Sequence, residues 1–378
     1  MRICFMVAAV FALASAASAE EPGRPTAILV SPIHEAQIVR ADDGKDHVEY
    51  ELLAINVFPE VVTLSSVTVL DPAGKELMRI EGGTLTAATQ ALFAHTETAV
   101  IPASAAVSVD VDLILPPGTA PERVTHRIAY TLKADSELAL MVGNLEVNAP
   151  EVTINRQPAM VIRPPLKGKG WLATTACCKP NVHRDLRVAI DGVHIETAET
   201  FAIDWAKVKN DRLFDGDGKR VEQYYGFGED VLAVADGTVV YIHDGMPDET
   251  PSVLMTPKSK SDYGGNNVIL EIAPKVFAWY AHLRQGSITV KAGDAVKTGA
   301  PIAKLGNTGP SEGPHLHLGL INKPDPIAGR SLPFVFDSFT LVGAIDFDAS
   351  KGDRLVIRPD SRQVRFAYPL YGGIQNYP

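Results

Sequence analysis

The chain has 378 residues, of which 46% are hydrophobic and 21% charged, with a formal net charge of −10. This is enough apolar material for full hydrophobic cores, and the length predicts two or three domains. The negative charge, with no basic run to offset it, argues against nucleic acid or an anionic membrane surface as a partner.

Residues 1–19 have the pattern of a signal peptide. Arg2 supplies a positive start, residues 3–14 form an apolar run, and a small-residue cleavage site ends at Ala19. The run is too short to span a bilayer comfortably, and no later stretch is long and apolar enough to do so. We therefore expect an exported mature protein that begins near Glu20, in the periplasm or beyond if the source is a bacterium.

Residues 25–148 are typical of an all-β domain. Four apolar residues, Val107, Val109, Val111 and Leu113, alternate with polar ones, which is the period of a half-buried strand. Regular short strands separated by turns predict an immunoglobulin-like sandwich. Its sequence shows no concentration of His, Asp or Glu that looks like a site, so we expect a spacer or a docking module for a protein partner rather than a catalytic domain. Further strands are expected at 47–58, 61–70, 125–133 and 138–147.

Residues 149–165 contain four prolines and are expected to be a linker. Just after them, Cys177 and Cys178 are adjacent, and they are the cysteines that remain once Cys4 leaves with the signal peptide. In an oxidising compartment they could form a vicinal disulfide, although its geometry is far from that of the usual bridge. Buried thiols and soft metal ligands are the alternatives, and metal binding is disfavoured because adjacent side chains rarely converge on one ion.

Residues 166–330 form a different kind of sequence, rich in glycine turns and short strands. Asp204 lies between apolar neighbours in the strand-like segment 201–205. A single carboxylate on an apolar strand is costly unless it is paired or bound to a metal. The segment 211–218 superficially resembles a calcium loop, but it lacks acidic ligands at the right intervals, so a hairpin turn is expected there.

Two histidines share one face of a predicted strand near the end of this region. His315 and His317 alternate with Leu316, Leu318 and Leu320. Because residues i and i+2 of a strand point to the same face, both imidazoles face one way while the leucines face the core. One histidine can then supply a nitrogen to Zn²⁺ while its neighbour handles protons. The alternative is a polar strand face that happens to carry two histidines.

Five short sequence motifs occur in a characteristic order, at residues 202–205, 231–240, 280–283, 290–299 and 313–318. In this order they resemble the lysostaphin-like M23 family of zinc metallopeptidases. The resemblance covers roughly a third of the chain, about residues 201–320. It implies a small antiparallel β fold with an open groove that cuts the peptide bridges or stems of bacterial peptidoglycan.

The resemblance also implies site residues. Asp204 and His317 match the family's metal ligands, whereas His282 and His315 match the unliganded histidines that activate water and stabilise the tetrahedral intermediate. Asn266 loosely matches an asparagine that lines the groove. A zinc ion held by three protein ligands keeps one position open and lowers the pKa of water to about 7, which suits amide hydrolysis.

One position departs from the family pattern. The family's first ligand is a histidine four residues before its aspartate, and Thr200 occupies that position here. A hydroxyl is a poor zinc ligand, so a working site needs a nitrogen from elsewhere, and His183 and His194 are the candidates. We favour His183, which lies in an irregular stretch that can fold over a groove and is followed by Arg184 and Asp185, two residues able to orient a ligand. The alternative is a degenerate site.

The remaining segments complete the interpretation. The long connection 241–262, with Lys258 and Lys260, is expected to be one wall of the substrate groove or a solvated loop tip. Residues 331–378 are expected to form a C-terminal β extension, packed on the second domain or on the sandwich. A shortened protein that begins near Pro165 is expected to keep any zinc binding.

The sequence thus predicts an exported, two-domain, all-β zinc endopeptidase that hydrolyses peptide bonds of peptidoglycan. The first alternative is a degenerate relative that binds the cell wall or activates another wall hydrolase. A peptidase that acts on other glycine-rich extracellular peptides is the second.

Overall fold

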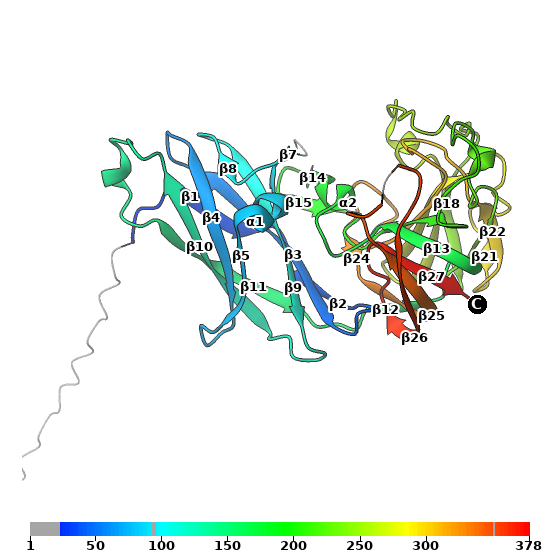
Figure 1. The fold of residues 1–378 in the computed structure, drawn as a ribbon, viewed down its shortest axis with the longest axis horizontal. Coiled ribbons are helices and arrows are strands. Elements are labelled where there is room, and N and C mark those ends of the chain that lie inside the picture. Colours follow the sequence, from blue (N-terminus) through cyan, green and yellow to red (C-terminus); the bar gives the residue numbers. More distant parts are fainter. Residues whose placement is uncertain (1–22, 93–95, 351) are drawn as a thin grey trace, which may run out of the picture.

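The computed structural model describes residues 23–92, 96–350 and 352–378. The predicted signal peptide, residues 1–19, lies outside these described residues. Within them the regular secondary structure is mainly β, as predicted, and forms two large sheets with separate hydrophobic cores (Figure 1). Among the described helices, none has the length and apolar character needed to cross a membrane.

The first sheet folds over itself to make the N-terminal region. Its hydrogen-bonded path runs β5-β4-β10-β11-β2-β3-β9-β6-β7, with β1 beside β3 and β8 beside β4. Helix α1 (Gly82–Ala88) and a 3₁₀ turn (Ala139–Met141) interrupt it. The strands are β1 Ile28–Pro32, β2 Ala36–Arg40, β3 Asp46–Asn56, β4 Val62–Leu70, β5 Glu76–Glu81, β6 Thr89–Ala91, β7 Thr96–Glu97, β8 Val100–Ile101, β9 Ala106–Leu115, β10 Arg123–Leu132 and β11 Glu146–Asn155.

Strands on the two sides of this fold share one core. Val48 and Tyr50 of β3 belong to the same buried cluster as Val67 of β4 and Ile128 of β10, although β3 is not hydrogen-bonded to β4 or β10. Two layers that share a core are the arrangement of a sandwich. The specifically immunoglobulin-like topology stays a prediction.

Two boundaries in this region differ from the sequence expectation. The strand expected at 138–147 is mostly the 3₁₀ turn and a loop, and β11 instead runs from Glu146 to Asn155. Most of β11 therefore lies in residues 149–165, the predicted linker, which also contains β12 (Met160–Ile162). Four prolines did not prevent pairing, because Val152 and Ile154 contribute buried side chains to the core.

The second sheet builds the C-terminal region. Its path is β12-β25-β27-β13-β16-β23-β20-β19-β18-β21, with β24 beside β23 and β26 beside β25. Its other strands are β13 Gly168–Thr175, β16 Ile203–Lys207, β18 Gly237–His243, β19 Asn266–Ala273, β20 Val276–Leu283, β21 Ala295–Val296, β23 Leu316–Ile321, β24 Ser331–Leu332, β25 Phe334–Ile345, β26 Ile357–Ala367 and β27 Gly373–Tyr377.

Smaller elements complete this region. They are two β-ribbons, a single turn of α-helix and two 3₁₀ turns: β14 Arg187–Ile190 with β15 His194–Thr197, β17 Asp230–Leu232 with β22 Pro301–Lys304, α2 Val182–Asp185, Val221–Gln223 and Lys260–Gly264.

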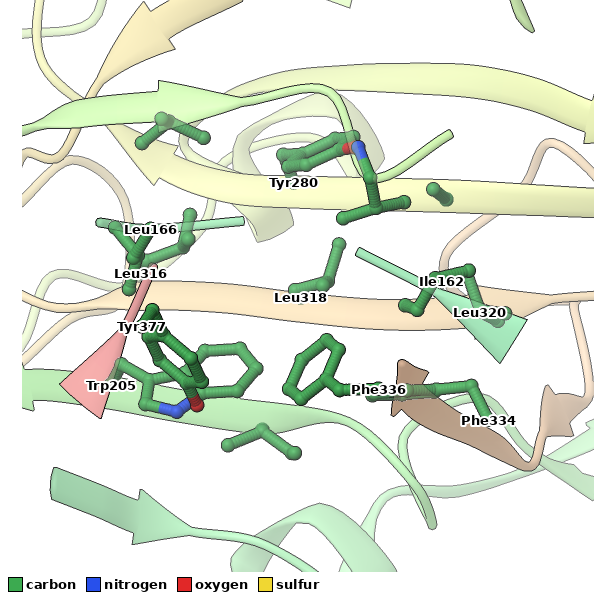
Figure 2. Close-up of a cluster of buried hydrophobic side chains, with 14 of the residues drawn as sticks. Ile162, Leu166, Trp205, Tyr280, Leu316, Leu318, Leu320, Phe334, Phe336 and Tyr377 are labelled. Atoms are coloured by element: carbon green, nitrogen blue, oxygen red, sulfur yellow. The ribbon is translucent and has the colours of Figure 1, made fainter. Parts of the chain in front are cut away.

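Strand β23 shows the alternation expected from the sequence. Leu316, Leu318 and Leu320 point into a core shared with Trp205 and Phe336 (Figure 2). The other face of β23 therefore carries the intervening residues, including His317. The apolar face fixes the register of β23, because a slip of one residue would expose all three leucines.

The C-terminal extension, residues 331–378, belongs to the second sheet. Its strands β25 and β27 pair with β12 and β13, and they enclose the same core. The extension also reaches the first region, where Tyr368 bridges to Ala41 and Arg362 donates to the Asp42 carbonyl. Helix α2 and the β14–β15 ribbon lie between the two regions (Figure 1).

Candidate metal centre and catalytic site

Three neighbouring strands bring the predicted site residues together. Asp204 of β16 pairs with His317 of β23, and His317 pairs in turn with Ala281 of β20. Residues that pair in adjacent strands share a face, so the carboxylate and the imidazole meet on the side of the sheet opposite the leucines. His282 follows Ala281 directly and stands at the end of β20.

His183, Asp204 and His317 form a compact buried group, which we call the metal cluster. The donor atoms of these three side chains all lie within 4.8 Å of one another. Asp204 bridges the two histidines, with His183 Nε2 3.0 Å from its Oδ2 and His317 Nδ1 2.9 Å from its Oδ1. The structure thus places the His183 ring beside Asp204 and His317.

Local hydrogen bonds hold His183 in place. It lies in α2, a single turn whose first amides are capped by the side chain of Asn181, which accepts from His183 N at 2.9 Å. The His183 Nδ1 lies 3.3 Å from the Ala202 carbonyl, which directs Nε2 towards Asp204. A backbone carbonyl behind the ring is the usual support for a metal-binding histidine.

The charges in the metal cluster are strongly coupled. Burial disfavours the charged form of His183, but attraction to Asp204, a hydrogen bond with it and attraction to Glu199 outweigh burial and raise the His183 pKa to about 9. Burial also opposes ionisation of Asp204, yet His183 and His315 hold its pKa well below the ordinary value. The carboxylate is therefore ionised, and a metal ion would displace the proton from His183.

The residues present fit a zinc ion. Two imidazoles and one carboxylate are ligands that zinc accepts, and three protein ligands leave one position open, as in catalytic sites. The donor separations of 2.9 and 3.0 Å are close to the spacing of about 3.4 Å that a tetrahedron with bonds of about 2.1 Å requires. Among the described residues, the ion-pair partners of the Asp204 carboxylate are histidines, and no Lys or Arg pairs with it.

His282 and His315 lie beside the metal cluster with their rings fixed. Their ring centroids are 4.7 Å apart, and the His282 ring is 6.0 Å from that of His317. Each ring has its Nδ1 2.8 Å from a backbone carbonyl, that of Thr308 for His282 and that of Gly313 for His315. An Nδ1 that donates to a carbonyl leaves Nε2 as the atom that can exchange protons.

Two further features of His282 are typical of functional sites. Its φ of 59° is in the left-handed region, which is uncommon for residues other than glycine. Burial, together with repulsion from His315 and His317, holds its pKa well below the ordinary value. His282 is therefore neutral, with a lone pair on one ring nitrogen.

Three other residues singled out from the sequence lie elsewhere. His194 is on the β14–β15 ribbon, where its half-exposed ring lies 3.5 Å from Glu196 and takes no part in the metal cluster. Thr200 is buried but offers no imidazole. Asn266 is wholly buried and bonds to both backbone groups of Met246. The expectation that Asn266 lines the groove is wrong, because its amide serves to anchor the loop.

The loop 241–262 borders a pocket on the face of the sheet that carries the metal cluster. The pocket has a volume of about 340 Å³ and is lined by Tyr241 and Ile269, among others. Tyr241 pairs with Ile269, Ile269 with Trp279, and Trp279 with Gly319, two residues beyond His317. Its wall at 260–261 comes from the end of this loop. Lys260 is paired with Asp325, so the pocket wall is not a free basic patch.

A buried carboxylate, two imidazoles beside it and two flanking histidines are a combination of residues that suits a metal-dependent hydrolase. Residues 222–328 match Peptidase family M23, so this segment of the chain belongs to that family. The matched segment contains His282, His315 and His317. Asp204 and His183 precede it, and their place in the site comes from the structure.

Similarity to individual proteins is confined to part of the chain. Over 110 residues the chain is 36% identical to the peptidoglycan DD-endopeptidase ShyA of Vibrio cholerae, which is 29% of this chain and 23% of that protein. The chain therefore spans about a quarter of the curated relative that it matches.

Solved structures with similarity include the catalytic domain of lysostaphin from Staphylococcus simulans, at 22% identity, covering 43% of this chain and 84% of that one with a TM-score of 0.23. The catalytic domain of a variant of the prophage-encoded M23 protein EnpA from Enterococcus faecalis has 19% identity, covering 46% and 93%, with a TM-score of 0.27.

Proposed function

We propose that this chain is an exported zinc-dependent endopeptidase that hydrolyses peptide bonds in bacterial peptidoglycan. The observation that carries the proposal is the metal cluster, in which His183 supplies the nitrogen that Thr200 cannot. The relative ShyA is a peptidoglycan endopeptidase, and the residues 222–328 that match the family include both flanking histidines and one ligand. The signal-peptide pattern at residues 1–19 supports export to the compartment that contains this substrate.

Each site residue has a role that follows from its contacts. His183, Asp204 and His317 would hold the zinc ion, which supplies Lewis-acid polarisation of the scissile carbonyl and makes water acidic enough to react near neutral pH. His282, with Nδ1 tied to Thr308, accepts the proton of the attacking water at Nε2. That proton then passes to the nitrogen of the leaving amine, which completes hydrolysis.

His315 is suited to the complementary role. Its Nε2 lies 3.5 Å from the Asp204 carboxylate, on the side of the metal cluster. An N–H at this atom can donate to the oxygen that becomes negative as the carbonyl is attacked, which stabilises the transition state. Rigid supports for both histidines matter, because such donors act best when they need no rearrangement.

The pocket beside the loop 241–262 gives the substrate a place to lie. It is open on the same face as the metal cluster and carries both apolar and polar side chains, including Tyr241, Ile269 and Ser261. A peptide stem of peptidoglycan combines small apolar and polar groups and has no fixed fold, so it can extend along such a surface.

Digestion of purified peptidoglycan sacculi tests this proposal. The full chain, loaded with zinc, should release soluble fragments with one new amino group and one new carboxyl group per cut, identified by mass spectrometry. Chelation should abolish release and added zinc should restore it. Sacculi that bind the zinc-loaded protein but stay uncut would support the alternative, a degenerate wall-binding protein. Cleavage that persists after complete removal of metal would contradict zinc chemistry.

A further inference from the structure

The outer face of the N-terminal sandwich carries a row of buried acidic residues. In β3, Val48 and Tyr50 face the sandwich core, so the alternating Glu49 and Glu51 face away from it. Glu51 pairs with Asp110 of β9, which adds a third carboxylate to the row. Glu49 and Glu51 are 0% exposed and Asp110 is 3% exposed. Asp110 is far from Glu49 and Glu51 in the sequence, and the pairing of β3 with β9 brings it into the row.

One arginine from the second half of the chain donates hydrogen bonds to carboxylates of this row. Arg184 is 0% exposed, its Nη1 donates to Glu49, and its Nη2 and Nε donate to Glu51 at 2.9 and 3.2 Å. Its Nη2 also donates to the Tyr50 carbonyl at 3.2 Å. Arg187, a short distance along the chain, donates to Asp110. We call the buried set of Glu49, Glu51, Asp110, Arg184 and Arg187 the interface cluster.

The interface cluster and the metal cluster meet at one peptide bond. His183 and Arg184 are consecutive residues of α2, and both side chains are buried, one towards Asp204 and the other towards Glu49 and Glu51. A single helical turn has almost no stability of its own. Its position must therefore come from what its side chains contact, and the guanidinium has the larger number of contacts.

We propose that the N-terminal sandwich helps to form the metal centre. Its carboxylates, Glu49, Glu51 and Asp110, hold Arg184 through ion pairs and thereby position the adjacent His183 for zinc. This inference rests on the proposed zinc site. In a shortened protein that begins near Pro165, Arg184 would lose its carboxylate partners. From the sequence we expected such a protein to keep its zinc binding. On this proposal we expect it to lose that binding.

The substitution at position 200 explains why this chain needs such a support. A ligand on the segment immediately before Asp204 would be held by the strand itself. His183 instead comes from a segment 21 residues earlier (204 − 183), beyond the β14–β15 ribbon. Without a second anchor this segment could leave the site at little cost, and the carboxylates of the sandwich supply that anchor.

The test compares full-length variants that alter the sandwich side of the contact. Glu49→Gln and Glu51→Gln, singly and together, keep side-chain size but remove the charges that hold Arg184, and neither residue is a proposed zinc ligand. Glu146→Gln is the matched control, because Glu146 forms a half-exposed pair with Arg127 on the same sandwich. Arg184→Met and Arg184→Lys probe the other side, with lysine expected to restore part of the effect.

Two quantities are measured at a temperature where circular dichroism shows each variant folded. The first is the zinc dissociation constant, from competition with a chelator, and the second is amide hydrogen exchange of residues 182–185 in the metal-free protein. We expect zinc binding weakened by about 10–100-fold and faster exchange in the double glutamine variant and in Arg184→Met. Glu146→Gln should match the wild type in both.

The outcomes separate this inference from the proposed function. Unchanged zinc affinity and unchanged exchange in the folded glutamine variants, including the case where only the melting temperature falls, would overturn the positioning role. If Arg184→Met does not fold, the glutamine variants decide. A wild-type chain that binds no zinc would contradict the proposed function, while the exchange measurement on metal-free protein would still decide whether the sandwich positions His183.

Discussion

The interface cluster and the metal cluster are both buried and both charged, but they differ in where their positive charge comes from. The interface cluster sets three carboxylates against two guanidinium groups, so permanent cations of the protein itself balance most of its negative charge. In the metal cluster, Asp204 contacts only imidazoles, whose nitrogens can release their protons to a metal ion. A buried set of donors without a permanent cation is thus a candidate metal site, whereas one closed by arginine is a structural contact.

A neighbouring group shows the value of this distinction. Donor atoms of His47, Glu49, Asp112 and Cys178 also lie within 4.8 Å of one another. Cys178 is joined to Cys177 by a disulfide, so it has no thiolate to offer a metal. Glu49 is bound by Arg184 and His47 is paired with Asp112, so these donors already have partners. The resemblance to a ligand set is therefore a matter of proximity alone.

The largest effect is expected from Asp204→Ala, which removes the group that both cluster histidines contact. Zinc binding and peptidoglycan cleavage should both be lost. Isothermal titration with zinc and digestion of sacculi measure the two losses. Asp230→Ala is the control, because Asp230 forms an exposed pair with Lys304. Stoichiometric zinc in the folded Asp204→Ala protein would show that the metal cluster is not the binding site.

A large effect on rate alone is expected from His282→Ala or His315→Ala. These rings flank the metal cluster but are not proposed ligands, so zinc should stay bound while cleavage falls by a factor of about 10²–10⁴. The measurement is the initial rate of fragment release at saturating zinc, alongside the zinc content. If either variant loses its zinc and its activity together, the division between ligands and proton-transfer groups is wrong.

Glu49→Ala should lower stability, because it leaves the buried guanidinium of Arg184 short of a partner. Removing one member of a buried ion pair costs about 3–5 kcal/mol, and Glu51 remains to limit the loss here to the lower end. Urea unfolding of the metal-free protein measures it. Glu146→Ala, at an exposed pair, should change the free energy of unfolding by less than about 0.5 kcal/mol. Equal free energies of unfolding for the two variants would show that the interface cluster does not stabilise the fold.

The smallest effect concerns His34, which extends the interface cluster through an ion pair of 2.6 Å with Glu51. Burial disfavours charged His34, but Glu51 more than compensates and raises its pKa, with a smaller contribution from Glu196. The pair therefore stabilises the fold fully below the unfolded pKa of about 6.5, and this stability is lost as the pH rises through the folded pKa.

His34→Gln should remove that part of the pH dependence, on the order of 1 kcal/mol between pH 6 and pH 9. Urea unfolding midpoints of wild type and variant across this range give the comparison. Curves that stay parallel throughout would mean that His34 does not titrate against Glu51.

Periodicity was enough to predict most of the strands, whereas the candidate site residues followed from the resemblance to the M23 family. The alternation of leucine and histidine around His317 predicted which face packs in the core, and the polar position of Asp204 on an apolar strand predicted a partner. Both are local properties, since each side chain's direction follows from its own strand. The C-terminal strands were likewise visible as apolar runs.

The interface cluster could not be predicted in the same way. Glu49, Asp110 and Arg184 are separated by dozens of residues, and each alone is an ordinary charged residue at an alternating position. Their burial depends on how two regions pack, which no local pattern encodes. The predicted boundary near residues 149–155 was wrong for a related reason. The proline content indicated a linker, but pairing with β10 makes this segment a strand.

Zinc content of the His183→Ala protein tests the central claim most directly, namely that His183 replaces the ligand missing at Thr200. The full-length wild type, His183→Ala and His194→Ala are saturated with zinc, dialysed against a weak chelator and analysed for metal per chain. We predict about one zinc per chain in the wild type and in His194→Ala, whose ring is half-exposed on the β14–β15 ribbon, and almost none in folded His183→Ala. Equal zinc in His183→Ala and the wild type would contradict the account.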